Sequence, residues 1–379
     1  MTMEWHSIHV HYHEPGLDRL IIEGIGPCTE RLADLAEVDG VYFVRHWLRG
    51  PHVRLNIRTT RDAFRTTVLP TAERIIGRFL AAHPSHGGCD EASLADTHRR
   101  LAELEHEAGP LFPWHADNTV VPARYDGRVQ AVRTAEAAQH LADFLTETTP
   151  LLLAMTEHVA AAESRRLALA FDLMVATAHR MSGGGIISGL GSLRSHAEAF
   201  LYRWPEGRGQ RPAWDRHYAH HAGSLARRVH QVTYGLDQPG AGLPRIPFVD
   251  SWVRSLGASM VTGYQLVNAG RLSMPSPAEA DQDAPDGMNL VDISPYHRAV
   301  WDSPRWQRIM DTPWMSTWRL ALNYLYLHLT RLGVTPAERF LLCHLAANAI
   351  EDAYGVSAMD LALRHSGRGQ EAETAEEAV

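Results

Sequence analysis

The chain has 379 residues, of which 45% are hydrophobic and 21% charged, and its formal net charge at pH 7 is −8. This length is enough for one large domain or two ordinary ones, and the acidic balance argues against a general nucleic-acid or anionic-membrane surface. No apolar run approaches the roughly 18 residues of a spanning helix, and the start lacks the apolar core of a signal peptide. Cys28, Cys89 and Cys343 are far apart, which is typical of a reduced, cytoplasmic protein.

The first part of the chain alternates strand and helix patterns. Period-2 alternation predicts strands over residues 5–12, 41–47, 52–58 and 118–123. Helical spacing predicts helices over residues 17–36, interrupted at Pro27, and over 61–82 and 94–107, with a loop at 83–90. This order is that of a split βαβ, ferredoxin-like layer, which we expect to be a mixed sheet.

The rest of the chain has helical patterns. We expect helices over residues 135–162, 165–180, 192–203, 214–234, 248–272, 314–332 and 336–354. Thr335 before Pro336 is an N-cap followed by proline at the first helical position. Residues 237–247 form a Pro/Gly linker and 275–285 a polar loop. We therefore predict an α+β protein with one catalytic domain over 1–365, sheet-rich in 1–130 and helical in 131–365, and an acidic disordered tail over 366–379.

Residues 42–58, YFVRHWLRGPHVRLNIR, form two alternating runs joined by Arg49-Gly50-Pro51. The second run places Val53, Leu55 and Ile57 on one face and His52, Arg54, Asn56 and Arg58 on the other. A row of guanidinium groups on a strand either points into water or lines an anionic or carbonyl-rich site. The residues alone leave both interpretations open.

Other familiar sites are not indicated. His9, His11 and His13 share a strand face, but no second cluster at ligand spacing accompanies them, so we predict no metal. Gly183-Gly184-Gly185 lacks the Lys-Ser/Thr of a phosphate-binding loop, and no GxSxG is present. Neither a nucleotide nor an acyl-enzyme is implied.

Four separated motifs share an order with a known family. They read FVRHWLRGPHVRLNIR over residues 43–58, PARYDG over 122–127, LRSHAE over 193–198 and CHLAAN over 343–348. Together they resemble the C-terminal elimination domain of lantibiotic dehydratases and its stand-alone thiopeptide relatives. The resemblance runs from about residue 5 to 360. In this family, strand and loop arginines hold a glutamyl leaving group and a helix histidine serves as acid or base.

The resemblance implies roles for particular residues. It places Arg54, Arg124 and His344 in one pocket as catalytic groups. It also implies substrate binding by the neighbours of these groups in the motifs: Arg45, His52, Tyr125, His196 and Asn348. Guanidinium forks suit carboxylates and enolate-like oxygens, and a histidine suits proton transfer near neutral pH.

Departures from the family pattern change the expected reaction. Asn56 stands where a second strand arginine is expected, Asp126 replaces a glycine, and Ala349 replaces the arginine of the last helix; the glutamate expected before Arg124-Tyr125 is also absent. A leaving group without charge needs fewer arginines. The chain therefore resembles the thiopeptide pyridine synthases, which join two dehydroalanines by a formal [4+2] aza-cycloaddition with loss of water and leader peptide.

Further candidates come from polar residues in apolar surroundings. Tyr264 lies mid-helix as a catalytic candidate with Gln265 for substrate binding, although a core tyrosine is an alternative. Ser294, as a catalytic group, and Tyr296, for substrate binding, precede a tryptophan-rich helix with His297, and a surface loop is the alternative. Ser195 beside His196 also fits a structural cap, and His344 a core histidine.

The implied partner is a modified precursor peptide, with a leader and a core containing azoles and dehydroalanines, and other thiopeptide maturation enzymes are possible partners. No metal or redox cofactor, nucleic acid or membrane is expected. Two alternatives remain open. Beside the pyridine synthase, the chain fits a stand-alone glutamate-elimination enzyme of a split dehydratase or a non-catalytic leader-binding scaffold of the same fold.

Overall fold

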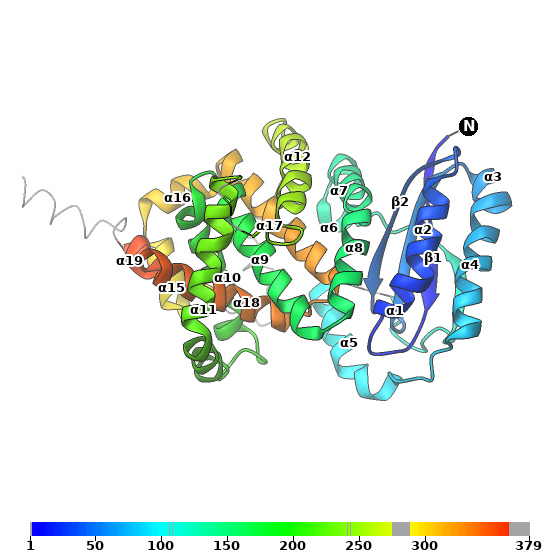
Figure 1. Cartoon of the computed structure of the whole chain (residues 1–379), viewed down its shortest axis with the longest axis horizontal. Coiled ribbons are helices and arrows are strands. Elements are labelled where there is room, and N and C mark those ends of the chain that lie inside the picture. Colours follow the sequence, from blue (N-terminus) through cyan, green and yellow to red (C-terminus); the bar gives the residue numbers. More distant parts are fainter. Residues whose placement is uncertain are drawn as a thin grey trace, which may run out of the picture. The chain divides into compact units, whose positions relative to one another are not determined.

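The computed structural model describes residues 2–363 except 106, 108, 241, 243 and 275–288. The chain divides into two compact units, which we describe separately (Figure 1). The sheet unit comprises Met1–Glu163 and Thr330–Gly333, and the helical unit comprises Ser164–Leu329 and Val334–Val379. The predicted polar loop at 275–285 and acidic tail at 366–379 lie outside the described residues. That both units form one catalytic domain stays a prediction.

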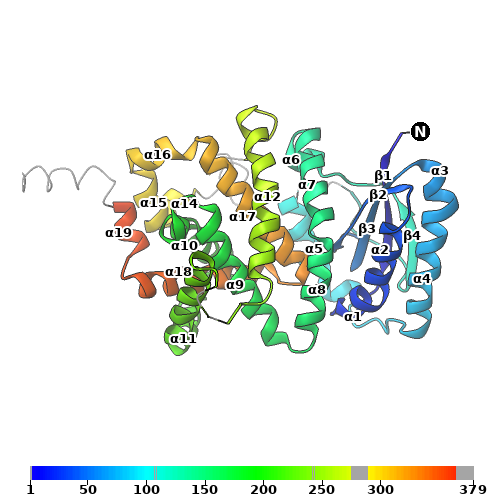
Figure 2. The same ribbon diagram turned by 45° about the horizontal axis from the view of Figure 1, so that its top comes forward.

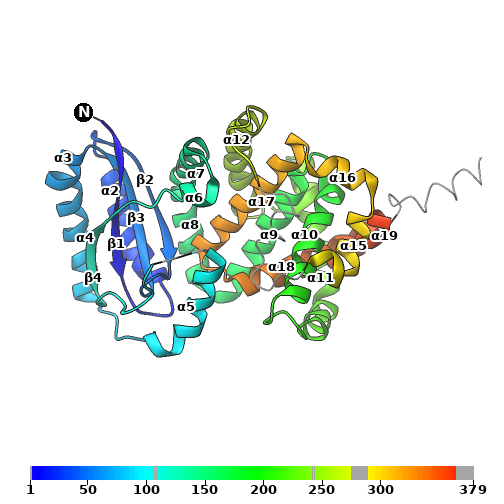
Figure 3. The same ribbon diagram turned by 180° about the vertical axis from the view of Figure 1, so that it is seen from behind.

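The sheet unit contains a four-stranded antiparallel sheet in the order β2-β3-β1-β4 (Figure 3). The strands are β1 (Glu4–His11), β2 (Val38–His46), β3 (His52–Thr59) and β4 (Thr119–Ala123). This confirms the predicted strands and their ferredoxin-like order. The expected mixed sheet was wrong, because the helical connections join parallel strands that are not adjacent, so every adjacent pair is antiparallel.

The two faces of the sheet differ in polarity, as the alternation predicted. The apolar face is fully buried and carries Ile8, Val10, Val53, Leu55 and Ile57. Burial of each such side chain contributes about 1.5–3 kcal/mol. On this face the ring of His6 stacks on Phe64 of the following helix at 4.3 Å. The opposite face carries the histidines and arginines of β1 and β3.

Two helices complete the ferredoxin-like layer, and both contain a π-helical turn before a proline. They comprise α1 (Asp18–Leu20), η1 (Ile21–Ile25) and α2 (Gly26–Ala33), and then α3 (Arg61–Ala63), η2 (Phe64–Val68) and α4 (Leu69–Ala82). The N–H of Gly26 donates to the carbonyl of Ile21. This wider turn lets the helix continue through Pro27, which has no N–H to donate. The predicted interruption is thus a π-helical turn rather than a break.

The remaining helices of the sheet unit are α5 (Glu91–Glu105), α6 (Val129–Val132), α7 (Ala135–Glu147) and α8 (Thr149–Ala160). The long helix predicted for 135–162 is two helices, because a new helix begins at Thr149 with Pro150 in its first turn. The turn before β3 needs Gly50, whose φ of 102° favours glycine. A Cβ atom there would lie 2.9 Å from Nε2 of His13.

The helical unit contains the helices predicted from residue 165 onward, which are α9 (Glu163–Met181), α10 (Gly185–Arg203), α11 (Arg211–Asp237), α12 (Val249–Asn268), α17 (Pro313–Leu332) and α18 (Pro336–Tyr354). Among the described residues it also contains four short helices whose bounds were not predicted, namely α14 (Leu290–Ile293), α15 (Pro295–Trp301), α16 (Pro304–Met310) and α19 (Ala358–Leu363). Helix α18 packs against both α10 and α11 (Figure 2). Thr335 and Glu338 form a capping box at the predicted start of α18. No helix among the described residues is long and apolar enough to cross a membrane.

Candidate functional site

In the helical unit, several predicted site residues gather around α10. This helix carries the consecutive polar residues Arg194, Ser195 and His196, followed by Glu198. Arg194 and Glu198 are buried, and a buried charge is costly unless it is paired. The partners of these four residues come from α11, α15, α17 and α18, so α10 is the element that connects the site.

Arg194 begins a hydrogen-bond chain that ends at His344. Its Nη2 donates to Oδ1 of Asn348 at 2.7 Å and to Oε2 of Glu351 at 2.5 Å. The amide of Asn348 is thereby oriented, and its Nδ2 donates to Nε2 of His344 at 2.9 Å. Because Nε2 accepts, the proton of the neutral imidazole resides on Nδ1.

His344 is buried, and burial together with the charge of Arg194 lowers its pKa to about 4. The imidazole is therefore neutral near pH 7. Its Nδ1 is buried and has no hydrogen-bond partner among the described residues. Oδ1 of Asp215 lies 3.1 Å from Nε2, a contact that becomes favourable when the ring is protonated. His344 thus has one unused N–H donor, and the nearby carboxylate of Asp215 would stabilise the protonated imidazole.

A second chain joins two serines through His297. Oγ of Ser195 lies 3.0 Å from Nε2 of His297, and Nδ1 of His297 lies 2.8 Å from Oγ of the fully buried Ser294. Ser294 also caps α15, because its Oγ accepts from the N–H of His297 at 3.4 Å. An imidazole between two hydroxyl groups can take a proton at one nitrogen and release one from the other. This arrangement is suited to moving a proton.

A third group consists of His196, Tyr326 and Cys343. The hydroxyl of Tyr326 lies 2.5 Å from Nδ1 of His196 and 3.4 Å from the thiol of Cys343. Burial lowers the pKa of His196 to about 4 and raises the pKa of the Cys343 thiol to about 11. All three groups are therefore neutral at pH 7 and act as hydrogen-bonding groups rather than charges.

A pocket of about 430 Å³ opens beside Arg194. It is lined by Arg194, Glu198, Tyr202, Arg211, Pro295, Tyr296, Glu351, Ser357 and Met359. Arg211 donates to both carboxylate oxygens of Glu198, at 3.1 and 2.5 Å. The hydroxyl of Tyr296 donates to the carbonyl of Gly191 at 3.0 Å, and burial raises its pKa. The charges of this pocket are thus largely compensated within it.

In the sheet unit, the predicted group Arg54 is held by two neighbours. Nδ1–H of His52 donates to the carbonyl of Gly50 at 2.8 Å, so its Nε2 accepts from Nε of Arg54 at 3.2 Å. Nη1 of Arg54 donates to Oδ2 of Asp126 at 3.3 Å. Asp126 is one of the departures from the family pattern. It supplies the carboxylate that partly neutralises Arg54.

Histidines of β1 extend this polar face. The register pairs His9 with Arg54 and His11 with His52, and both imidazoles lie within 5 Å of the His52 ring, at 4.8 and 4.9 Å. Burial lowers the pKa of His9 to about 4 and that of His11 to about 3. His11 is fully buried, and neither of its ring nitrogens has a hydrogen-bond partner among the described residues. The face is therefore a stack of neutral imidazoles beside one guanidinium.

Three other predicted residues of the sheet unit lie in different settings. Arg45 donates to Oδ1 of Asp18 at 2.6 Å and to the carbonyl of Arg331 at 2.9 Å, contacts that hold β2 in place. Tyr125 shares a hydrogen bond of 3.0 Å with the hydroxyl of Tyr42. Arg124 is exposed. The sequence placed Arg54, Arg124 and His344 in one pocket, but they belong to different units, so this stays a prediction.

Tyr264 and Gln265 do not join the group around α10. Both are exposed on α12, because this helix buries its opposite face through residues such as Trp252 and Leu256. The interior position expected for Tyr264 was therefore wrong, since its side chain is 48% exposed. A catalytic role for either residue stays a prediction.

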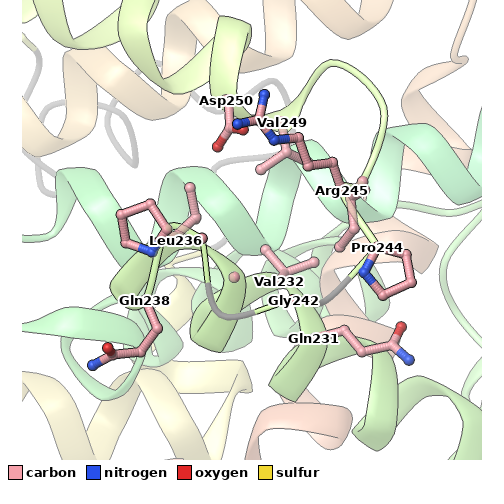
Figure 4. Close-up of a pocket in the computed structure, with 13 residues that line it drawn as sticks. Gln231, Val232, Leu236, Gln238, Gly242, Pro244, Arg245, Val249 and Asp250 are labelled. Carbon is pink, nitrogen blue, oxygen red and sulfur yellow. The ribbon is translucent and has the colours of Figure 1, made fainter.

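A second cavity, of about 240 Å³, lies where the predicted Pro/Gly linker joins α11 to α12. Figure 4 shows Arg245 and Asp250 on one side of it and Gln231 and Gln238 on the other. It contains none of the predicted site residues. Among the described residues, no group of three or more His, Cys, Asp or Glu side chains has the geometry to hold a metal ion.

Sequence reasoning did not assign Arg194, Tyr326 or Asp126 to the site. Arg194 carried a signal, because a charged residue in the apolar helix 192–203 requires a buried partner. Asp126 was noticed only as a departure from a motif. Tyr326 carried no signal, since its partner His196 lies 130 residues away in the sequence.

Comparisons with known proteins agree with this architecture. The family described as "Lantibiotic biosynthesis dehydratase C-term" matches residues 5–350. Among solved structures, "Pyridine synthase, TbtD, from thiomuracin biosynthesis" is 36% identical with a TM-score of 0.75, and the match covers 93% of this chain and 99% of that one. TsrL shares the fold at 22% identity and a TM-score of 0.71, over 96% of this chain and 99% of that one. No curated protein matches.

These matches confirm the family resemblance that the four motifs predicted. The family match extends over nearly all of the described residues of both units. The chain therefore belongs to the lantibiotic biosynthesis dehydratase C-terminal family.

Proposed function

We propose that this protein is a thiopeptide pyridine synthase. It joins two dehydroalanines of a modified precursor peptide by a formal [4+2] aza-cycloaddition. One dehydroalanine reacts as its iminol 2-azadiene and the other as the dienophile. Loss of water and of the leader peptide then forms the pyridine and closes the macrocycle.

The observation that carries this proposal is the 36% identity to a pyridine synthase over 99% of that chain. The pairing of Arg54 with Asp126 adds physical support. An enzyme that grips a glutamyl group needs guanidinium groups with unused charge. Here the protein supplies its own carboxylate to Arg54, and Asn56 replaces the second strand arginine. Both features favour a substrate without a glutamyl leaving group.

Two proton-handling groups in the helical unit suit the steps of this reaction. The Nδ1–H of His344 has no partner in the described protein, and in our proposal it donates to the substrate amide oxygen and so favours the iminol. The chain Ser195–His297–Ser294 moves a proton when water departs and the ring becomes aromatic.

Orientation of the two dehydroalanines is the other task of the enzyme. Holding two reacting groups in alignment is worth about 7–11 kcal/mol of the barrier. The neutral imidazoles of His9, His11 and His52 and the Arg54–Asp126 pair provide a polar face without net charge. Such a face suits amide and azole groups of a peptide core. The precursor peptide, with its leader, is therefore the proposed partner.

The test uses a leader-bearing core peptide that contains azoles and two dehydroalanines. The purified protein should convert it into a product that has lost water and leader and absorbs in the ultraviolet as a pyridine. The His344→Ala variant, checked for folding by circular dichroism, serves as the matched control. Mass spectrometry follows both reactions.

Two other outcomes correspond to the alternatives. Glutamate release from a glutamylated peptide, with no pyridine from the dehydroalanine peptide, identifies an elimination enzyme. Binding of the leader without turnover of either peptide identifies a non-catalytic scaffold. Either result refutes the pyridine synthase.

A further inference from the structure

Arg339, near the start of α18, is a half-buried arginine of the helical unit. Its Nε atom is buried and has no hydrogen-bond partner among the described residues. Its guanidinium lies over the rings of Tyr326 and Phe340, at 4.7 and 5.1 Å from their centres. Burial lowers its pKa, which records the cost of keeping this charge away from water.

Arginines elsewhere in the protein show what a satisfied guanidinium looks like. Arg331, only eight positions earlier, is fully buried and donates to four neutral acceptors: Phe43 O, Leu145 O, Thr148 Oγ1 and Thr149 Oγ1. In the helical unit, carboxylates pair with Arg194, Arg211 and Arg228. Arg339 has neither arrangement in the part of the chain that we describe. Its contact with two aromatic faces is the weaker kind of compensation for a charge.

The hydrogen bonds around Arg339 leave a second donor beside it. The hydroxyl of Tyr326 can donate its single hydrogen to Nδ1 of His196 while it accepts from the thiol of Cys343. This direction places the proton of the neutral His196 ring on Nε2. Tyr326 places the two groups near each other, because its ring lies 4.7 Å from the guanidinium of Arg339 and its hydroxyl lies 2.5 Å from Nδ1 of His196. A fixed cation and a neutral N–H donor together match the two oxygens of a carboxylate.

We propose that Arg339, with Nε2–H of His196 beside it, binds a carboxylate of the peptide substrate. This inference rests on the proposed function and adds a recognition group to it. The carboxylate belongs either to the C-terminus of the core peptide or to an acidic side chain of the leader. Because His196 adjoins Ser195 of the proton-moving chain, the bound carboxylate anchors the peptide close to the candidate site.

The experiment compares Arg339→Met and Arg339→Lys with the wild type. Methionine keeps the length and apolar contacts of arginine and removes the charge, whereas lysine keeps the charge and loses the planar fork. Arg227→Met, which removes an exposed arginine of α11, is the matched control. Peptide binding is measured by fluorescence anisotropy, which does not require turnover, and the KM for pyridine formation is measured in parallel.

Three peptides separate the sources of the carboxylate. They are the bis-dehydroalanine peptide with a free C-terminus, the same peptide as the C-terminal amide, and a version whose leader has Asn and Gln in place of Asp and Glu. For the first peptide, Arg339→Met should raise Kd and KM about 30-fold, with little change in kcat. One of the two other peptides, the C-terminal amide or the Asn/Gln leader version, lacks the carboxylate that Arg339 binds. That peptide should bind equally weakly to the wild type and to Arg339→Met. The Kd and KM of Arg339→Lys should lie between those of the wild type and Arg339→Met.

Thermal unfolding of the free protein excludes a purely structural role. Because no carboxylate pairs with Arg339 among the described residues, Arg339→Met should have a Tm equal to or a few degrees above that of the wild type. A large fall in Tm, as for a guanidinium that holds the fold together, overturns the proposal. So does an unchanged Kd, or a loss of binding that is the same for all three peptides. A protein that binds these peptides through Arg339 but forms no pyridine refutes only the proposed function.

Discussion

Acid should destabilise the sheet unit through the imidazoles on its polar face, and His11 should account for a measurable share. His11 is fully buried with a pKa of about 3, whereas an unfolded histidine has a pKa of 6.5. Above pH 6.5 the ring is neutral in both states and adds no pH dependence. As the pH falls from 6.5 towards 3, the unfolded state binds the proton first, so stability is lost throughout this window.

The size of the effect follows from the difference in pKa. A pH of 5 is 1.5 units below the pKa of an unfolded histidine. This difference corresponds to a loss of about 2 kcal/mol in the free energy of unfolding per histidine. His9, with a pKa of about 4, adds less than this because its side chain is only half-buried. Together the two should cost the sheet unit roughly 2–4 kcal/mol between pH 7.5 and pH 5.

The variant His11→Leu isolates one of these contributions. At pH 7.5 it should be more stable than the wild type by about 1 kcal/mol or more, because a buried imidazole without hydrogen-bond partners among the described residues is replaced by an apolar side chain. At pH 5 this difference should grow by about 2 kcal/mol. Val10→Ala, on the other face of β1, is a control whose effect should not depend on pH because neither residue titrates.

Urea unfolding at the two pH values measures these differences. Hydrogen exchange of β1 and β3 peptides, corrected for the intrinsic pH dependence of exchange, assigns them to the sheet unit. The reasoning is refuted if the stability difference between His11→Leu and the wild type is the same at both pH values.

Other variants test the site and the fold. His344→Ala and Arg54→Ala should each lower kcat for pyridine formation about 100-fold or more while leader binding changes little; wild-type rates in steady-state assays would remove these residues from the site. Arg331→Met removes the donor of four buried hydrogen bonds and should destabilise the sheet unit by about 3 kcal/mol or more in urea unfolding; a loss below about 1 kcal/mol would show that these hydrogen bonds do not stabilise the unit. Thr335→Ala should cost about 1 kcal/mol, and Thr335→Ser much less, because serine keeps the cap; equal losses in thermal unfolding would argue against the capping box.

The alternation in β3 predicted both its secondary structure and its two faces. Val53, Leu55 and Ile57 are buried on the apolar face, as their spacing indicated. Thr335 followed by Pro336 likewise marked the first residue of α18. Both features depend on neighbours within a few residues, so the chain encodes them locally.

Side-chain partners were less accessible to this reasoning. Arg45 and Arg54 lie on the same pair of strands, yet one holds Asp18 and a backbone carbonyl and the other pairs with Asp126. Tyr264 looked like an interior residue because its helix is apolar, but the helix turns this position towards solvent. The period of a helix shows that it has a buried face, and packing decides which positions lie at its edge.

The sequence by itself determined the order of strands and helices, the two faces of the sheet and the family. Only the tertiary structure showed that Asp126 pairs with Arg54, that Arg194 reaches His344 through Asn348, and that Nε of Arg339 has no hydrogen-bond partner among the described residues. The partners of Arg54 and Arg194 lie 72 and 154 residues away. Local pattern decides how each segment folds, whereas the match between a charge and its distant partner exists only once the segments have packed.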